Sequence, residues 1–269
     1  MTITLPYLPQ RPSKPRNSGL TMMMDKGLST AEAENFVENC APYTDLIKLG
    51  FGTSVFCSNV EKKVKIYRNA GIRVYFGGTL FEAYAIRGMF DEYVKMVKSF
   101  NVDTVEVSDG SMYMHHSTKV DYISRLSKDF TVLSEVGSKV KGVEIADEVW
   151  VEMMQTELNA GSWKVIAEAR ESGTTGIYNS DGSANDSLIN LIKVKLNPDA
   201  VIWEAPSNKQ QAWFIKLIGP NVNLGNIATN DVIPLECLRE GLRGDTFLDF
   251  LPAELKQQKP DSAKYQKLD

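Results

Sequence analysis

Acidic and basic side chains recur where the short apolar runs of this chain end. The residues of this kind are Asp25, Lys48, Glu82, Glu106, Asp109, Glu135, Lys139, Asp181 and Glu204. Acids grouped with lysines are typical of a site that binds a hard, oxygen-liganded cation such as Mg²⁺ beside an anionic substrate. Taken alone, any one of these acids is more simply explained as a helix-capping or surface residue.

Three of these charged residues stand inside apolar runs rather than after them. Lys48 interrupts the run DLIKLG, Glu106 lies within DTVEV, and Glu204 ends AVIWE. A charge in a buried strand is costly unless an opposite charge or a metal ion pairs with it. These three positions therefore favour a charged site over scattered surface residues.

A second group of residues has the composition of a phosphate site. Ser207 and Gln210 lie in the stretch EAPSNKQQ, and Gly225 and Asn226 lie in NLGNIATND. Backbone amides in such loops, together with a helix N-terminus, are a common way to hold a phosphate group. We therefore expect Ser207, Gln210, Gly225 and Asn226 to bind substrate, although ordinary capping and turn chemistry explains the same residues.

The composition excludes other kinds of site. The chain has 269 residues with a formal net charge of -4, only 3 cysteines and only 2 histidines. The cysteines lack CxxC spacing, which excludes a disulfide scaffold and fits a reducing cytosol. The adjacent His115 and His116 are too few for a zinc cage and are expected to be solvated, while Met22, Met23 and Met24 are expected to pack in the core.

The charge pattern and hydropathy also limit the partners. Without a run of basic residues, the chain is not expected to bind nucleic acid. No apolar segment reaches the length of a membrane span, and the first residues lack the apolar run of a signal peptide. We therefore expect a cytoplasmic protein that acts on small molecules.

The apolar runs alternate regularly with longer amphipathic stretches. The runs predict eight strands at residues 19–24, 45–50, 72–76, 103–107, 130–136, 174–178, 200–204 and 221–225. The stretches between them predict helices at 30–40, 60–69, up to about 100, 118–127, about 148–171, 184–195, 207–217 and 231–242. Ser29 is the expected N-cap of the first helix.

This alternation predicts an α/β protein, a single-domain (β/α)8 TIM barrel over residues 1–269 with a polar tail from about 251. An open doubly wound sheet is the alternative, but no GxGxxG follows the first strand. In a parallel barrel, active-site residues gather at the carboxyl ends of the strands. The charged residues above should therefore meet at that end.

Several long motifs of the sequence resemble the phosphosulfolactate synthase family. They are RPSKPRNSGLTMMMDKG, DLIKLGFGTS, VYFGGTLFE, VEVSDG, VLSEVGSK, WEAPSNKQQAWFIKLIGPNVNLGNI and LECLREGLRGDTF, and they span about residues 11 to 250 in this order. The resemblance implies a barrel enzyme that adds sulfite to phosphoenolpyruvate with Mg²⁺, giving (2R)-2-O-phospho-3-sulfolactate, an early intermediate of coenzyme M biosynthesis. It also implies a homo-oligomer, with a trimer as one option.

The implied chemistry can be matched to the charged residues. Sulfite attacks C3 of the substrate, negative charge develops on the substrate carboxylate, and a proton is then delivered to C2. We expect Lys139 to donate that proton and Lys48 to be its electrostatic partner. The expected metal ligands are Glu106, Asp109, Glu135 and Glu204.

Two alternative functions remain open, and one motif does not lie at the end of a strand. An aldolase with Lys48 or Lys139 as a Schiff base would explain the lysines but not the acids. The family also resembles plant heat-stress-associated proteins without known synthase activity, so a non-enzymatic role is the second alternative. In the motif KPR, Arg16 precedes the first strand. Either Arg16 has a structural role at the opposite end of the barrel or in an oligomer interface, which we expect, or the first strand begins later than predicted.

Overall fold

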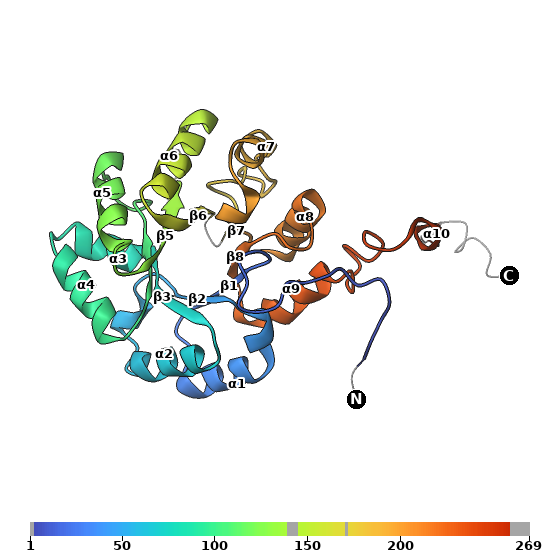
Figure 1. The fold of residues 1–269 in the computed structure, drawn as a ribbon, viewed down its shortest axis with the longest axis horizontal. Helices are drawn as coiled ribbons and strands as arrows, with labels where there is room; N and C mark the ends of the chain where they lie inside the picture. The colour runs from blue at the N-terminus through green and yellow to red at the C-terminus, as the bar shows by residue number, and fades with distance from the viewer. Residues whose placement is uncertain (1–2, 139–144, 170–171, 259–269) are drawn as a thin grey trace.

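Eight parallel strands form a ring at the centre of the computed structural model, which describes residues 3–138, 145–169 and 172–258 (Figure 1). The strands are β1 (Thr21–Asp25), β2 (Leu46–Leu49), β3 (Arg73–Phe76), β4 (Thr104–Val107), β5 (Thr131–Val136), β6 (Ser162–Ala167), β7 (Val201–Glu204) and β8 (Leu224–Ile227). Their order is β3-β2-β1-β8-β7-β6-β5-β4, and β3 and β4 lie against each other. The sheet is therefore a nearly closed barrel, and the expected (β/α)8 fold class is confirmed.

Helices surround this ring and cover its outer face (Figure 1). They are α1 (Thr30–Cys40), α2 (Val60–Asn69), α3 (Gly78–Ala85), α4 (Phe90–Ser99), α5 (His116–Leu126), α6 (Asp147–Asn159), α7 (Asp186–Lys195), α8 (Asn208–Ile218) and α9 (Val232–Arg239). The short α10 (Ala253–Lys256) lies away from the ring, on the segment that follows α9. Short 3₁₀ turns lie at Ala41–Tyr43, Thr53–Val55, Pro198–Ala200 and Thr229–Asp231. Among the described residues, no helix is both long and apolar enough to cross a bilayer.

Local sequence signals explain where several helices begin. Ser29 caps α1, because its side chain accepts from the backbone N–H of Glu32 while the Glu32 carboxylate accepts from the N–H of Ser29. Ser207 and Gln210 form the same reciprocal capping box at α8. Each box satisfies backbone donors that a helix start leaves without partners.

Apolar side chains fill the barrel in two separate clusters. The inner cluster lies within the ring and consists of Leu20, Met22, Leu46, Tyr75, Leu133, Ile166 and Ile202. The larger outer cluster lies between the strands and the helices and includes Met23, Phe36, Phe81, Trp150 and Trp203. Because the inner cluster fills the ring, a ligand can enter only at its ends.

The sixth strand corrects the sequence prediction. The expected helix over 148–171 ends at Asn159, and β6 follows at Ser162–Ala167, whereas the expected strand at 174–178 lies in the loop after β6. The helix stops at Gly161, whose φ of 116° is unfavourable for other residues, and a Cβ there would lie 2.6 Å from Ser127 Oγ. Alternation and β-branched residues in SWKVIA favour the strand, but the prediction merged this run with the helix before it.

Smaller differences affect two other regions. The eighth strand begins at Leu224, three residues after the expected position, and an additional helix, α3, follows β3 directly. The other six expected strands are present at the predicted places. The regular spacing of the apolar runs was therefore a sound guide except where a glycine ends one element just before the next.

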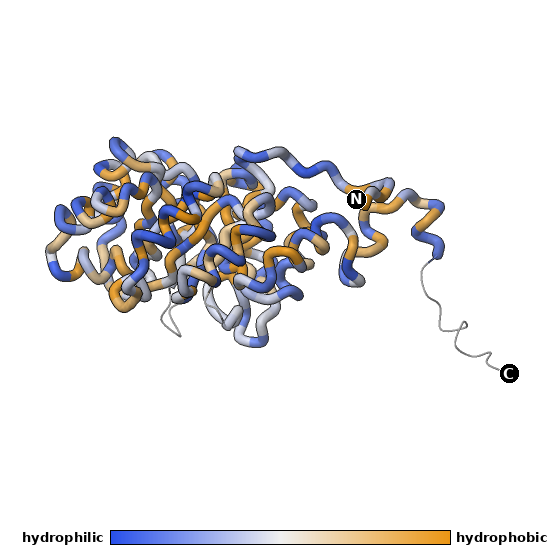
Figure 2. The backbone as a smooth tube through the Cα atoms, turned by 90° about the horizontal axis from the view of Figure 1, so that it is seen from below, coloured by the Kyte–Doolittle hydropathy of each residue, from blue (hydrophilic) through white to orange (hydrophobic). Residues whose placement is uncertain are grey.

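The segment before β1 closes the end of the barrel at which the strands begin. Arg16 forms a two-point ion pair with Asp45, the residue before β2, with N–O distances of 2.9 Å. Arg11 pairs with Glu236 of α9 at 2.8 Å and donates to the carbonyl of Gly19. Arg16 thus lies at the end opposite the expected active site. Figures 1 and 2 show the segments before β1 and after α9 leaving the barrel on the same side.

Lys164 of β6 supports the same closed end. Its Nζ atom donates to the carbonyls of Asn17 and Asp199, at 2.9 Å and 2.6 Å. Burial lowers the pKa of Lys164 to about 8, against a smaller opposing effect of Asp199. An unfolded lysine titrates near pH 10.4, so the unfolded chain binds more protons than the folded chain from about pH 8 upward.

Replacing Lys164 by methionine should therefore change how stability depends on pH. The unfavourable burial of the ammonium is fully present below about pH 8 and is relieved as the pH rises toward 10. We expect the free energy of unfolding of the unsubstituted protein to rise by roughly 1–2 kcal/mol relative to Lys164→Met between pH 8 and 10. Denaturant titrations measure it, with Lys62→Met, an exposed lysine, as control. Parallel pH curves for all three proteins would contradict the assignment.

Candidate active site at the mouth of the barrel

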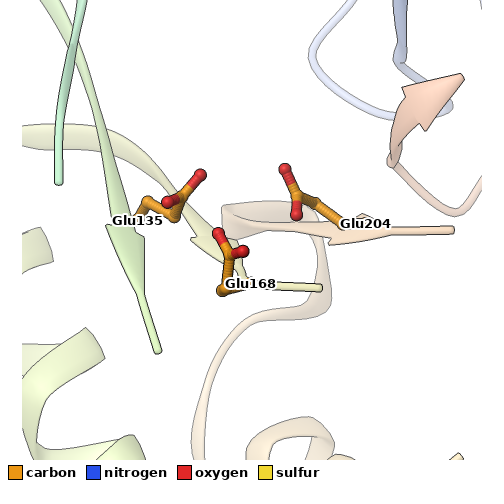
Figure 3. A group of neighbouring side chains, drawn as sticks. All are labelled: Glu135, Glu168 and Glu204. Atoms are coloured by element: carbon orange, nitrogen blue, oxygen red, sulfur yellow. The ribbon is translucent and has the colours of Figure 1, made fainter. Parts of the chain in front are cut away.

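Three glutamate carboxylates face one another at the carboxyl ends of β5, β6 and β7, which we call the mouth of the barrel (Figure 3). Glu135 lies near the end of β5, Glu168 follows β6 directly, and Glu204 ends β7. One oxygen of each lies within 4.8 Å of the others, and all three residues are buried. Oxygen donors in this arrangement suit a hard cation. We call these residues the glutamate triad.

Lys48 of β2 reaches the same place from across the ring. Its ammonium lies 3.0 Å from Glu135 Oε2, 3.0 Å from Glu106 Oε1 and 3.6 Å from Glu204 Oε1. Burial alone would lower the pKa of Lys48, but the carboxylates of Glu106, Glu135 and Glu204 raise it well above its ordinary value. Lys48 is therefore a fixed positive charge beside the triad, which disfavours the neutral amine that a Schiff-base mechanism needs.

Backbone hydrogen bonds hold Glu168 in the triad. Its N–H donates to the carbonyl of Val136 at 3.1 Å, and its carbonyl accepts from the N–H of Ile177 at 3.0 Å. The chain passes so closely here that a Cβ on Gly176, with φ of 72°, would lie 1.9 Å from the Glu168 carbonyl oxygen. Only glycine fits at position 176, which ties the loop after β6 to the triad.

The next residue, Ala169, is held by side chains from two neighbouring strands. The N–H of Ala169 donates to Glu204 Oε2 at 2.8 Å, and its carbonyl accepts from Asn226 Nδ2 at 2.9 Å. Asn226 has a positive φ of 57° and is 8% exposed. Asn226 therefore fixes the end of β6 relative to β8, in addition to any contact with a ligand.

A cavity of about 340 Å³ opens above the triad. It is lined by Met24, Lys48, Phe51, Thr79, Glu135, Glu168, Ala169, Ser172, Glu204 and Asn226. This volume accommodates a small acid, and the charged groups that line it, Lys48, Glu135, Glu168 and Glu204, come from four different strands or the loops that follow them. Charge and shape together make the cavity the candidate active site.

Two of the expected metal ligands lie outside the triad. Glu106 Oε1 accepts from the backbone N–H of Gly78 at 2.7 Å as well as from Lys48. Asp109 pairs with Lys119 at 2.9 Å. Glu106 is thus linked to the triad through Lys48, while Asp109 contacts a different lysine, so of the four expected ligands only Glu135 and Glu204 share the triad.

The expected substrate-binding residues are also divided. The side chains of Ser207 and Gln210 bond to each other, Gln210 Nε2 also donates to the Gly173 carbonyl, and neither residue lines the mouth cavity. A Cβ on Gly225 would lie 2.6 Å from Met22 Cε, so packing inside the barrel accounts for this glycine. Asn226 lines the cavity, and its Oδ1 atom is buried without a hydrogen-bond partner among the described residues.

Other charged residues singled out from the sequence have different surroundings. Asp25 bonds to Lys63 and Tyr67 of α2, Glu82 accepts from Ser108 and Ser111, and Asp181 is exposed in a turn with Ser183. His116, expected to be solvated, instead lies 3.2 Å from the buried Glu157. Lys139, the expected proton donor, lies outside the described residues.

The sequence prediction missed Glu168 because it misplaced the sixth strand. Once Gly161 is taken as the end of α6, the run SWKVIA becomes a strand, and Glu168 comes at the carboxyl end of that strand, as Glu135 and Glu204 do at theirs. The signal was therefore present in the sequence, in the combination of a helix-ending glycine and the following β-branched residues.

A family model and two relatives of similar sequence agree on one family for this chain. The model of the (2R)-phospho-3-sulfolactate synthase (ComA) family matches residues 9–245. A protein of Bacillus subtilis named phosphosulfolactate synthase is 39% identical over 245 residues, 89% of this chain and 96% of the relative. One of the same name from Methanothermobacter thermautotrophicus is 39% identical over 244 residues, 88% of this chain and 95% of the relative.

Solved structures resemble this chain in fold alone. The crystal structure of DHDPS from Cyanidioschyzon merolae with lysine bound has a TM-score of 0.54 and 12% sequence identity. The match covers 89% of this chain and 78% of that one. At this identity the likeness supports a common barrel architecture and says nothing about the reaction.

The triad predicts that Glu168 binds a divalent cation more directly than Glu106 does. Glu168→Gln should weaken Mn²⁺ binding by about 10- to 100-fold, because a neutral amide is a poorer ligand than a carboxylate. Glu106→Gln removes a buried acid of the same size that pairs with Lys48 but is not part of the triad. Its effect on the logarithm of the Mn²⁺ affinity should be less than a third of that of Glu168→Gln. Titration followed by the electron paramagnetic resonance of free Mn²⁺ measures both. Equal losses for the two variants would contradict the triad as the metal site.

Proposed function

The chain belongs to the (2R)-phospho-3-sulfolactate synthase family, and we propose that it adds sulfite to phosphoenolpyruvate with Mg²⁺, giving (2R)-2-O-phospho-3-sulfolactate. The observation that carries the proposal is the meeting of three buried carboxylates and one buried ammonium in a single cavity. Both substrates are anions, so the reaction needs concentrated positive charge in a pocket shielded from water. Glu135, Glu168 and Glu204 would hold the metal, which would present a local positive charge to the substrates beside the ammonium of Lys48.

The metal is proposed to lie between Glu135, Glu168 and Glu204. Their oxygens are already grouped within 4.8 Å, so small movements bring them into contact with one cation. The Mg²⁺ ion would supply positive charge beside the carboxylate of the substrate, where negative charge develops as the new C–S bond forms.

Lys48 has a separate role in this proposal. Its ammonium remains charged and is held by carboxylates from three strands, so it cannot move far during the reaction. A positive charge fixed in advance stabilises charge that appears in the transition state without reorganisation. Lys48 therefore orients and stabilises the substrate carboxylate rather than acting as an acid or base.

Proton delivery completes the reaction. When the sulfite sulfur bonds to C3, the electrons of the C2–C3 double bond move toward the substrate carboxylate, and C2 then takes up a proton. We assign this proton to Lys139, which follows β5 by three residues in the motif SEVGSK. We propose that the phosphate group lies toward β7 and β8, near Asn226, which lines the cavity.

An assay of the two substrates tests the proposed reaction. Purified protein is incubated with phosphoenolpyruvate and sulfite, with Mg²⁺ or with excess EDTA, and products are followed by phosphorus NMR and mass spectrometry. We expect a phosphosulfolactate product that requires the divalent cation, because the triad alone carries no positive charge. Folded protein that binds Mn²⁺ but forms no product under either condition would overturn the proposed activity.

Replacing the proposed proton donor should affect chemistry without affecting metal binding. We expect Lys139→Met to lower kcat by about 10²- to 10⁴-fold, the usual contribution of a general acid, and to leave Mn²⁺ affinity within about twofold. Lys141→Met, a substitution of a lysine two residues further along, serves as the control and should retain most of the activity. A kcat for Lys139→Met within a factor of a few of that of Lys141→Met would exclude Lys139 as the donor.

A further inference from the structure

Lys119 is a second buried lysine near the mouth, and the reaction proposed above does not use it. It lies in the first turn of α5 with its side chain 0% exposed. Its ammonium has three acceptors: Asp109 Oδ1 at 2.9 Å, Glu157 Oε1 at 2.9 Å, and the backbone carbonyl of Glu135. An ammonium has three N–H donors, so this set satisfies it.

The contact with the Glu135 carbonyl replaces a missing strand partner. The pairing of β4 with β5 ends at Val107 and Ser134, one residue before Glu135. Because the carbonyl of Val136 accepts from Glu168 on the β6 side, the carbonyl of Glu135 is directed toward β4, beyond the last pair of that ladder. A buried carbonyl needs a donor, and Lys119 provides it.

Glu157 of α6 forms a buried ion pair with Lys119. Burial alone would raise the pKa of Glu157, but Lys119, His116 and Ser134 together keep it below its ordinary value. Burial alone would lower the pKa of Lys119, but the carboxylates of Glu157 and Asp109 raise it to about 12. Lys119 and Glu157 are therefore both charged. Figure 1 shows α5 and α6, which carry them, side by side outside β5.

We infer that Lys119 is a positioning residue, which fixes the backbone of Glu135 so that its carboxylate meets Glu168 and Glu204. The inference rests on the proposed function, because it assigns the triad to the metal. Among the described residues, Lys119 contacts none of the triad's carboxylate oxygens. It acts instead on the backbone of Glu135. Through Asp109 it also ties the loop after β4 to the end of β5. Outer contacts of this kind set the orientation of metal ligands and strongly affect metal affinity.

Another buried lysine offers a matched control. Lys63 of α2 is 2% exposed and pairs with the buried Asp25 at the end of β1, at 2.8 Å. It resembles Lys119 in lying on a helix outside the barrel and holding the end of a strand. Within the described part of the chain, its ammonium pairs with Asp25 and with no triad residue, so its loss should reduce stability without moving the triad.

The test compares Lys119→Met with Lys63→Met in the full chain. Each replaces a buried ammonium by a side chain of similar length, and each is expected to lower the melting temperature. Mn²⁺ is the probe of the triad, with affinity measured by electron paramagnetic resonance. We expect Lys119→Met to bind Mn²⁺ about 10- to 100-fold more weakly and Lys63→Met to stay within about twofold of the unsubstituted protein.

A second variant and a kinetic readout keep the test decisive. Lys119→Gln retains N–H donors and is expected to recover part of the Mn²⁺ affinity lost in Lys119→Met, which makes it useful even where the methionine variant folds poorly. At saturating Mn²⁺ we expect the kcat of Lys119→Met to fall by a smaller factor, relative to the unsubstituted protein, than its Mn²⁺ affinity does. A purely structural role would instead lower the melting temperature alone.

Three results would overturn the inference. Unchanged Mn²⁺ affinity in Lys119→Met and Lys119→Gln would contradict it while leaving the proposed function intact. Equal weakening in Lys119→Met and Lys63→Met would assign the effect to general loosening of the barrel. If the unsubstituted protein binds no Mn²⁺, the triad is not a metal site, and both the proposed function and the inference fall together.

Discussion

Like charges that are buried together dominate this structure. Glu106, Glu135, Glu168 and Glu204 are each at most 2% exposed and lie around one buried ammonium, that of Lys48. Removing a carboxylate from water costs several kcal/mol, and neighbouring carboxylates repel one another where water cannot screen them. Such a group persists only when cations and the surrounding backbone hold it. The bonds to Gly78, Ala169 and Glu168, and the rigid parallel strands beneath them, provide that support.

Much of this arrangement follows from the pattern of residues along the chain. The alternation of apolar runs with amphipathic stretches is enough to predict a parallel barrel, and the barrel predicts that strand-end residues meet. Lys48 and Glu204 were recognisable because each is a charge in an apolar run, which is stable only beside a partner. The role of Arg16 at the opposite end followed from its distance along the chain from the first strand end.

Other features depend on contacts between distant residues, which spacing does not reveal. Glu168 was missed because the boundary between α6 and β6 depends on one glycine conformation, at Gly161. Asp109 and Glu135 both come at or after the end of an apolar run. Asp109 nevertheless forms an ion pair with Lys119 of α5, whereas Glu135 forms one with Lys48. Ser207 and Gln210 carry polar groups suited to a phosphate, but each satisfies the other in a helix cap. In each case the role of the side chain depends on a partner that residue spacing in the sequence does not identify.

The closed end of the barrel has a consequence for how the protein forms on the ribosome. β1 pairs with β8 as well as with β2, and Arg11 pairs with Glu236, so the first segment to emerge finds its last partners only near the end of translation. The ring cannot close before β8 is synthesised, by which time the strand that carries Lys48 is already present. We therefore expect the carboxylates at the mouth to lose their hydration late, when Lys48 is available to pair with them.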